Sequence, residues 1–108
     1  MSDRDEAVDD LFAALADPTR RLLFRRLAAS GPDTATRLAT GLPLTRQAVV
    51  KHLQILAEAG LVDSERHGRE VRFTARPAAL TEAVAWLLAA GARWDRRLER
   101  LRQRVETA

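Results

Sequence analysis

Apolar residues recur along most of this chain at helical spacing, and in one stretch they alternate with polar residues as in β-strands. The helical spacing predicts helices over residues 5–16, from 18 to the break at 30–33, over about 34–40, about 45–59 and about 77–105. The alternation predicts two strands, 61–66 and 70–75. Together these elements predict one domain over residues 1–108, mainly helical with a small β-hairpin, in the order α-α-α-α-β-β-α.

Residues with strong capping preferences mark several predicted helix ends. Asp17 and Thr45 are N-cap residues, because their side-chain oxygens can accept a hydrogen bond from an early helical N–H. Pro18 suits the first helical position, and Gly60 tolerates the positive φ that is common just after a helix. The arginines at positions 20, 21, 25 and 26 are expected to stay in solvent. The apolar positions predict a core of Val8, Leu11, Phe12, Leu15, Leu23, Phe24, Leu27, Leu38, Ala39, Val49, Leu53, Leu56, Leu61, Val71 and Phe73.

The helix over about 45–59 has two different faces. Its apolar stripe of Val49, Leu53 and Leu56 would face a core, and a short helix and a Gly-containing turn precede it. This arrangement is typical of a helix-turn-helix unit, whose second helix enters the major groove of double-stranded DNA. The chain is therefore predicted to bind DNA sequence-specifically. The opposite, donor-rich face carries Arg46, Gln47, Val50, Lys51 and Gln54.

The side chains at the start of this helix are expected to have different roles in DNA recognition. Arg46 and Gln47 are candidates for base contacts, because Arg suits guanine and Gln suits adenine in the major groove. Lys51 is expected to hold a phosphate, which positions the protein without reading sequence. Thr45 is expected to cap the helix and is also a candidate for phosphate contact.

The predicted hairpin over about 61–75 would form the wing of a winged helix-turn-helix fold. Its turn, His67-Gly68-Arg69, contains a glycine that permits a tight connection. Arg69 lies at the tip, where it is a candidate for contact with the DNA backbone or a narrow minor groove.

The last predicted helix carries a heptad-like seam. Apolar or small residues are spaced alternately by four and three for more than three heptads, which calls for a partner helix. The alternative is a helix that packs only on its own domain, but the repeat is longer than a domain of this size can cover. We therefore predict a homodimer, in which Gly91 allows close backbone approach. The seam residues are Leu80, Val84, Leu87, Gly91, Trp94, Leu98, Leu101 and Val105.

Charge is unevenly distributed along the chain. Residues 1–17 hold six acids against one Arg, residues 18–76 hold eleven basic residues against five acids, and the net charge of the whole chain is +3. A basic middle segment is expected of a surface that binds phosphates. The chain contains 17 Arg and one Lys, and genomic base composition explains this preference for Arg over Lys. It does not explain why acidic and basic residues are segregated along the chain.

Composition also excludes several classes of protein. The 108 residues contain no cysteine, so no thiol site is possible, and only two histidines and five glycines. No Ser–His–Asp set, phosphate-binding glycine loop or metal cluster appears in the sequence, and we expect no enzyme. No apolar run is long enough to span a membrane and no signal peptide is recognisable, so a cytoplasmic protein without membrane contact is expected. A winged helix that binds protein instead of DNA is the alternative function.

Several motifs resemble the ArsR-type winged helix-turn-helix regulators: residues 16–21 (ADPTRR), 45–53 (TRQAVVKHL) and 58–62 (EAGLV). Residues 68–70 and the stretch Trp94-Asp95-x-x-Leu98 resemble the branch whose genes often neighbour small START-like (SRPBCC) proteins. The resemblance covers about residues 10–102. It implies a homodimeric repressor, often of its own or a neighbouring operon, that binds an inverted-repeat operator. It also implies an interface made by the first and last helices, so Leu11 is a further interface candidate.

The resemblance also bears on single residues and on metals. His52 follows the family pattern and is a candidate for DNA-backbone contact, with a hydrogen-bonded structural histidine as the alternative. Val50 replaces a serine that is common in the family, and it could rest against a thymine methyl. Metal-sensing members use cysteines before the recognition helix or Asp/His/Glu sets on the last helix. With no cysteine and no histidine in residues 77–108, we expect no metal and no other cofactor.

Overall fold

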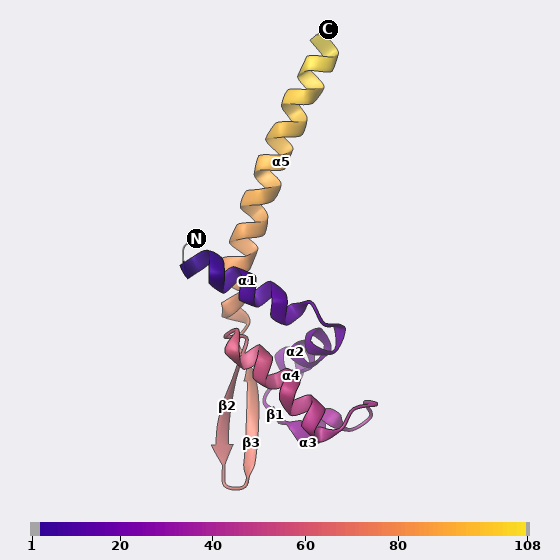
Figure 1. The fold of residues 1–108 in the computed structure, drawn as a ribbon, viewed down its shortest axis with the longest axis vertical. Helices are drawn as coiled ribbons and strands as arrows, with labels where there is room; N and C mark the ends of the chain where they lie inside the picture. Colours follow the sequence, from indigo (N-terminus) through magenta and orange to yellow (C-terminus); the bar gives the residue numbers. More distant parts are fainter. Residues whose placement is uncertain (1–2, 108) are drawn as a thin grey trace.

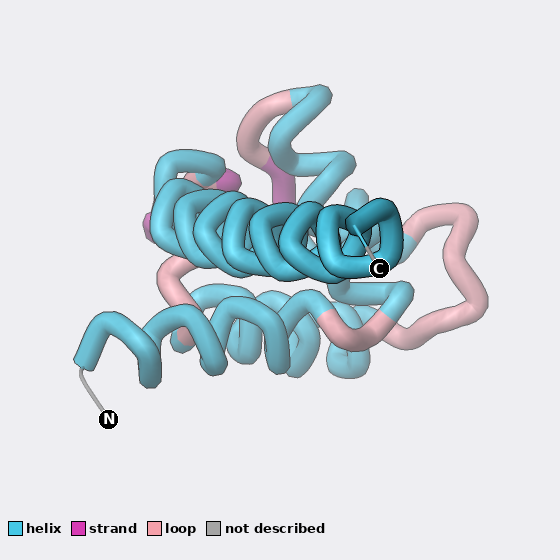
Figure 2. The backbone as a smooth tube through the Cα atoms, turned by 90° about the horizontal axis from the view of Figure 1, so that it is seen from above, coloured by secondary structure: helices cyan, strands magenta, loops and turns pink. Residues whose placement is uncertain are grey.

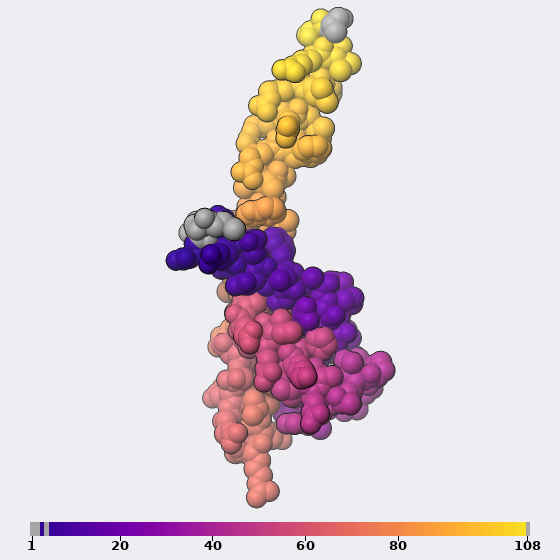
Figure 3. All heavy atoms as spheres, in the orientation of Figure 1, coloured from indigo at the N-terminus to yellow at the C-terminus, as the bar shows by residue number. Residues whose placement is uncertain are grey.

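A computed structural model describes residues 3–107 of the chain, and its helices and strands follow the predicted order with two differences (Figure 1). A short strand, β1, is added, and a 3₁₀ turn, η1, occupies the predicted start of the last helix. The elements pack into a compact body from which the last helix projects (Figure 3), giving a molecule of 70 × 30 × 21 Å. Figure 2, seen from above, shows that helices make up most of the chain. The elements are α1 (Asp3–Leu15), α2 (Pro18–Ser30), β1 (Asp33–Thr34), α3 (Ala35–Ala39), α4 (Arg46–Glu58), β2 (Val62–His67), β3 (Glu70–Ala75), a 3₁₀ turn η1 (Pro77–Leu80) and α5 (Thr81–Thr107).

The predicted helix caps are confirmed. Asp17 accepts a hydrogen bond from the backbone N–H of Arg20 at 3.0 Å, and Pro18 follows it as the first residue of α2. Thr45 accepts from the N–H of Ala48 at 3.0 Å and so begins α4. Each bond satisfies one of the N–H groups that a helix leaves without a partner at its first turn.

The wing is part of a three-stranded antiparallel sheet in the order β1-β3-β2. Strands β2 and β3 form the predicted hairpin, in which Val62 pairs with Ala75 and His67 with Glu70. The third strand, β1, pairs Asp33 with Phe73 and was not predicted from the sequence. Two residues are too few to show a strand-like alternation, so only the tertiary pairing with β3 defines this strand.

The core lies where α1, α2, α3 and α4 meet the base of the sheet. Leu23, Val49, Leu53, Leu56 and Leu61 are each fully buried there, as their spacing predicts. On α1 the prediction was wrong at one position: Phe12 is 36 % exposed, and Ala14 is buried instead. The ring of Phe12 lies edge-on against Trp86 of α5, with centroids 5.7 Å apart, because α5 crosses this side of α1.

Two arginines expected in solvent instead join α1 to α2. Arg20 donates from Nε to the carbonyl of Ala14 at 2.6 Å, and Arg21 donates from Nη1 to the carbonyl of Leu15 at 2.7 Å. The last carbonyls of a helix have no partner within the helix, so a cationic donor at that end stabilises it. The sharp turn at Asp17 places both arginines within reach of these carbonyls.

Candidate nucleic-acid interface

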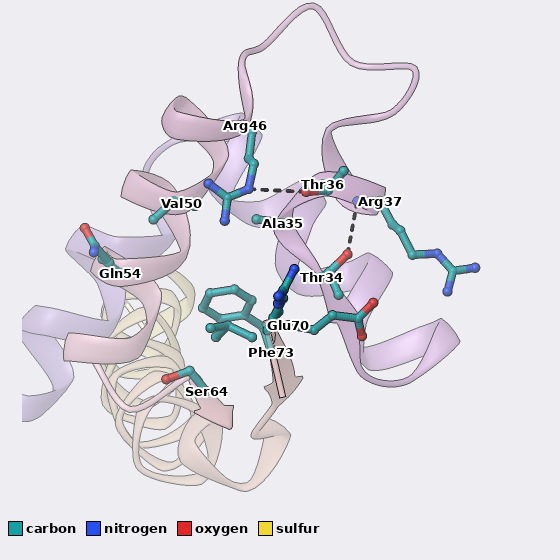
Figure 4. Close-up of a pocket in the computed structure, with 12 residues that line it drawn as sticks. Thr34, Ala35, Thr36, Arg37, Arg46, Val50, Gln54, Ser64, Glu70 and Phe73 are labelled. Carbon is teal, nitrogen blue, oxygen red and sulfur yellow. Dashed lines mark hydrogen bonds between the residues drawn. The ribbon is translucent and has the colours of Figure 1, made fainter. Parts of the chain in front are cut away.

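The exposed face of α4 lies beside the wing and the short helix α3. These three elements enclose a groove of about 490 Å³ (Figure 4). Val71 and Phe73 line it from β3, Val50 and Gln54 from α4, and Ala35 from α3. The side chains of α4 that face solvent next to this groove are the ones predicted to meet DNA.

Helical spacing separates the two faces of α4 as predicted. Val49 and Leu53 are fully buried, whereas Gln47, Lys51 and Gln54 are exposed. Within the described residues these three exposed side chains make no hydrogen bond or ion pair, so their polar groups are available to a partner. The only acidic residue of α4 is Glu58, at its far end. The exposed face is therefore rich in donors and carries no negative charge near the start of the helix.

Arg46, the first residue of α4, turns toward α3. Its Nε donates to the Thr36 hydroxyl oxygen at 3.2 Å, and Figure 4 shows the guanidinium beside the groove. Thr36 was not among the predicted site residues, since nothing in the local periodicity of α3 distinguishes it. Arg37 lies at the edge of the groove with its guanidinium turned outward, and its Nε is 3.6 Å from a carboxylate oxygen of Asp33.

Val50 does not stand free on the reading face. Its side chain is half-buried, packs against the core and lines the groove with Val71 and Phe73. The contact to a thymine methyl therefore remains a prediction, and it involves only the part of the side chain that stays exposed.

His52 lies elsewhere, and the structure does not bring it to the donor-rich face. It comes three residues after the buried Val49, which places it on the flank of α4 that packs toward the start of α2. The side chain is 22 % exposed, with Nδ1 3.9 Å from a carboxylate oxygen of Asp17. That Nδ1 atom is buried and has no hydrogen-bond partner in the described part of the chain. This position at the junction of α2 and α4 favours the structural alternative, and the contact with the DNA backbone remains a prediction.

At this junction the carboxyl group of Asp17 has a lowered pKa. The backbone N–H of Arg20, which donates to the carboxylate, is the largest cause that holds the pKa of the Asp17 carboxyl below its ordinary value. The nearby side chains of His52 and Arg20 act in the same direction, against the opposing effect of partial burial. The carboxylate form is thus the one that the folded structure favours.

The wing presents charged side chains of both signs. Arg69 is exposed at its turn and makes no ion pair among the described residues, so it is free to contact a phosphate. Behind it, Arg72 lies 3.5 Å from Glu70 and His67 lies 3.6 Å from Glu65. These exposed pairs contribute little to stability and leave Arg69 as the free cation nearest the tip.

The seam of α5 is exposed over most of its length, as Figure 3 shows for the projecting helix. Trp94, Leu98 and Leu101 are 57 %, 45 % and 57 % exposed, and none of them belongs to the buried core formed by the described residues. Two interface candidates pack on their own domain in the single chain, and their contact with a partner remains a prediction. Leu11 is only 4 % exposed because it belongs to the core of its own domain, and Leu80 lies in η1, half-buried against that core.

Two features are absent from the described residues. In residues 3–107 no group of three or more His, Cys, Asp or Glu side chains is placed to hold a metal ion. No helix within that range has the length and apolar character needed to cross a bilayer.

Comparison with known proteins places the chain in a family. A family model described as a helix-turn-helix domain matches residues 15–65, which include α2, α3 and α4. An ArsR-like transcriptional regulator from Rhodococcus sp. RHA1 has a similar structure, with a TM-score of 0.79 and 42 % identity over 91 % of this chain and 92 % of that one. The chain belongs to the ArsR family of winged helix-turn-helix transcriptional regulators. This confirms the predicted fold and the expectation that the protein is no enzyme.

Two curated relatives agree with this assignment. The HTH-type transcriptional regulator YuzN of Bacillus subtilis is 45 % identical over 67 residues, or 56 % of this chain and 73 % of its own length. The transcriptional repressor SdpR of the same organism is 27 % identical over 81 residues, or 75 % of this chain and 89 % of its own length. The function predicted from α4, transcriptional regulation through DNA, is therefore the function of the family.

Proposed function

We propose that this ArsR-family protein is a homodimeric repressor that binds an inverted-repeat operator in its own or a neighbouring operon. The observation that carries the proposal is the face of α4 on which Gln47, Lys51 and Gln54 are exposed and unpaired beside the wing. Such a face matches the donor and acceptor pattern of the major groove. An acidic face would suit a protein-binding winged helix better, and α4 has no acid before Glu58.

Dimerisation is supported by the apolar face of α5. Exposed Trp94, Leu98 and Leu101 lie on one side of a helix about 40 Å long, and a continuous exposed apolar surface of this kind is typical of a protein–protein interaction site. A two-fold dimer presents two copies of α4, which suits half-sites about one helical turn apart. Repression is suggested by SdpR, which is named a transcriptional repressor.

The branch of the family is a finer part of the proposal. The Gly68-Arg69-Glu70 turn and the Trp94-Asp95 pair resemble the regulators whose genes neighbour START-like proteins. With no cysteine in the chain, thiolate metal sensing is not the proposed switch.

The experiment is a selection of random DNA duplexes by the purified protein, followed by mobility shifts on the selected site and on the region upstream of its gene. We expect a two-fold symmetric site whose affinity falls with rising salt, because each phosphate contact releases counterions. Absence of salt-sensitive binding to any selected or upstream sequence would contradict the proposed function.

Substitutions in α4 then distinguish side chains that read bases from side chains that hold the DNA backbone. Arg46→Ala and Gln47→Ala are each expected to relax the preference at particular base pairs, at a cost of about 1–3 kcal/mol. Lys51→Ala is expected to weaken binding to all sequences alike and to flatten the salt dependence. Arg96→Ala removes the same charge from the exposed surface of α5 and serves as the control for Lys51. Equal losses for Lys51→Ala and Arg96→Ala would mean that only net charge matters.

A further inference from the structure

One hydrogen bond joins α3 to α4 across the helix-turn-helix unit. Arg46 Nε donates to Thr36 Oγ1 at 3.2 Å (Figure 4). Thr36 is the second residue of α3 and Arg46 is the first of α4, so the two side chains meet only when the turn between the helices has folded. The bond is exposed to solvent, and it adds little to the packing of the domain.

The bond leaves the most selective part of the arginine free. A guanidinium has five N–H donors, of which Nε carries one and the two Nη atoms carry four. Within the described residues, Arg46 uses only its Nε donor, which forms the hydrogen bond to Thr36. The paired Nη groups remain available as the fork that matches O6 and N7 of guanine.

We propose that Thr36 is a positioning residue for DNA reading, whose hydroxyl holds the Arg46 guanidinium in the orientation that contacts guanine. This inference rests on the proposed DNA-binding function. A free arginine loses much rotamer freedom when a ligand immobilises it, and a side chain that is already oriented loses less. Thr36 thus raises the affinity for guanine without touching the base.

The variants follow from the chemistry of position 36. Thr36→Val keeps the shape of the side chain and removes the acceptor, whereas Thr36→Ser keeps the acceptor. Thr40→Val is the matched control, since the Thr40 hydroxyl donates to the backbone carbonyl of Thr36 at 3.2 Å and does not contact Arg46. An unchanged thermal unfolding midpoint in each variant shows that the domain still folds.

The assay measures affinity for the duplex selected by the wild-type protein and for the same duplex with the Arg46-dependent guanine replaced. Thr36→Val should lower affinity for the first duplex about three- to tenfold and should hardly change affinity for the second. Thr36→Ser and Thr40→Val should both stay close to wild type. In an Arg46→Ala background the effect of Thr36→Val should vanish, because the two residues act as one unit.

Other results overturn the inference in distinguishable ways. If the wild-type protein selects a site and Arg46→Ala weakens its binding, but Thr36→Val does not, then Thr36 has no positioning role. An equal loss from Thr36→Val in the Arg46→Ala background would assign Thr36 a role of its own. If the wild-type protein selects no sequence, the proposed function itself is overturned, and this inference with it.

Discussion

Replacing one leucine on the exposed seam of α5 should separate the proposed dimer into monomers. Leu98 is 45 % exposed in the single chain, and it comes well after Ala83 and Trp86, through which α5 packs on the core and on α1. Leu98→Asp should therefore leave the folded domain intact and act on the interface alone.

The expected loss of dimerisation free energy follows from the apolar area of Leu98 that is exposed in the single chain and would be buried in the dimer. Full burial of a leucine side chain is worth about 1.5–3 kcal/mol, so covering the exposed half contributes about 1 kcal/mol per protomer and about 2 kcal/mol per dimer. Two carboxylates placed in the same apolar seam add an unfavourable term of about 1–3 kcal/mol. A total of about 4 kcal/mol weakens the dimer by about a thousandfold.

Sedimentation velocity over a range of protein concentrations measures this change. The wild-type protein should sediment as a dimer and Leu98→Asp as a monomer at the same concentration. Gln103→Asp introduces the same negative charge on the opposite face of α5 and should leave the dimer unchanged. A dissociation constant that Leu98→Asp does not alter would refute the assignment of the seam, and equal weakening by both variants would point to charge instead of burial.

Two further predictions concern stability. Leu53→Ala should lower the free energy of unfolding by about 2–5 kcal/mol, because Leu53 is fully buried. Ile55 is 40 % exposed, so Ile55→Ala should lower this free energy much less. Urea denaturation measures both changes. Asp17 has a pKa lowered in the folded state, so its stabilising effect is present above the ordinary aspartate pKa and is lost as the pH falls through the lowered value. Asp17→Asn should therefore flatten the fall in unfolding free energy below about pH 4, and a parallel fall in both proteins would contradict this.

Features that depend on local chemistry can be predicted from this sequence. A cap such as Asp17 or Thr45 needs only a side-chain oxygen and a backbone N–H three residues later, so the sequence around it is sufficient. The split of α4 into a buried and an exposed face depends only on helical period, which explains why Gln47 and Lys51 lie where expected.

Features that depend on the packing of distant segments could not be predicted. Strand β1 exists because β3 lies beside it, and the Thr36–Arg46 bond exists because the turn brings two helices together. On α1 the apolar spacing does not show which side chains enter the core. Leu11 is buried in the core, whereas Phe12 is more exposed and lies against Trp86. His52 belongs to the family motif, but the motif does not reveal that its neighbour in space is Asp17, which precedes it by 35 positions in the sequence.

The proposed dimer seam and the reading face belong to one packed domain, which determines how seam variants should behave on DNA. Arg20 and Arg21 join α2 to the end of α1, and the shared core joins both helices to α4. Loss of the α5 seam should therefore leave each α4 face unchanged and remove only the link between two copies. A Leu98→Asp monomer should keep the base preferences of the dimer on a single half-site, while its affinity for the full operator should fall steeply, because the second half-site is no longer bound intramolecularly.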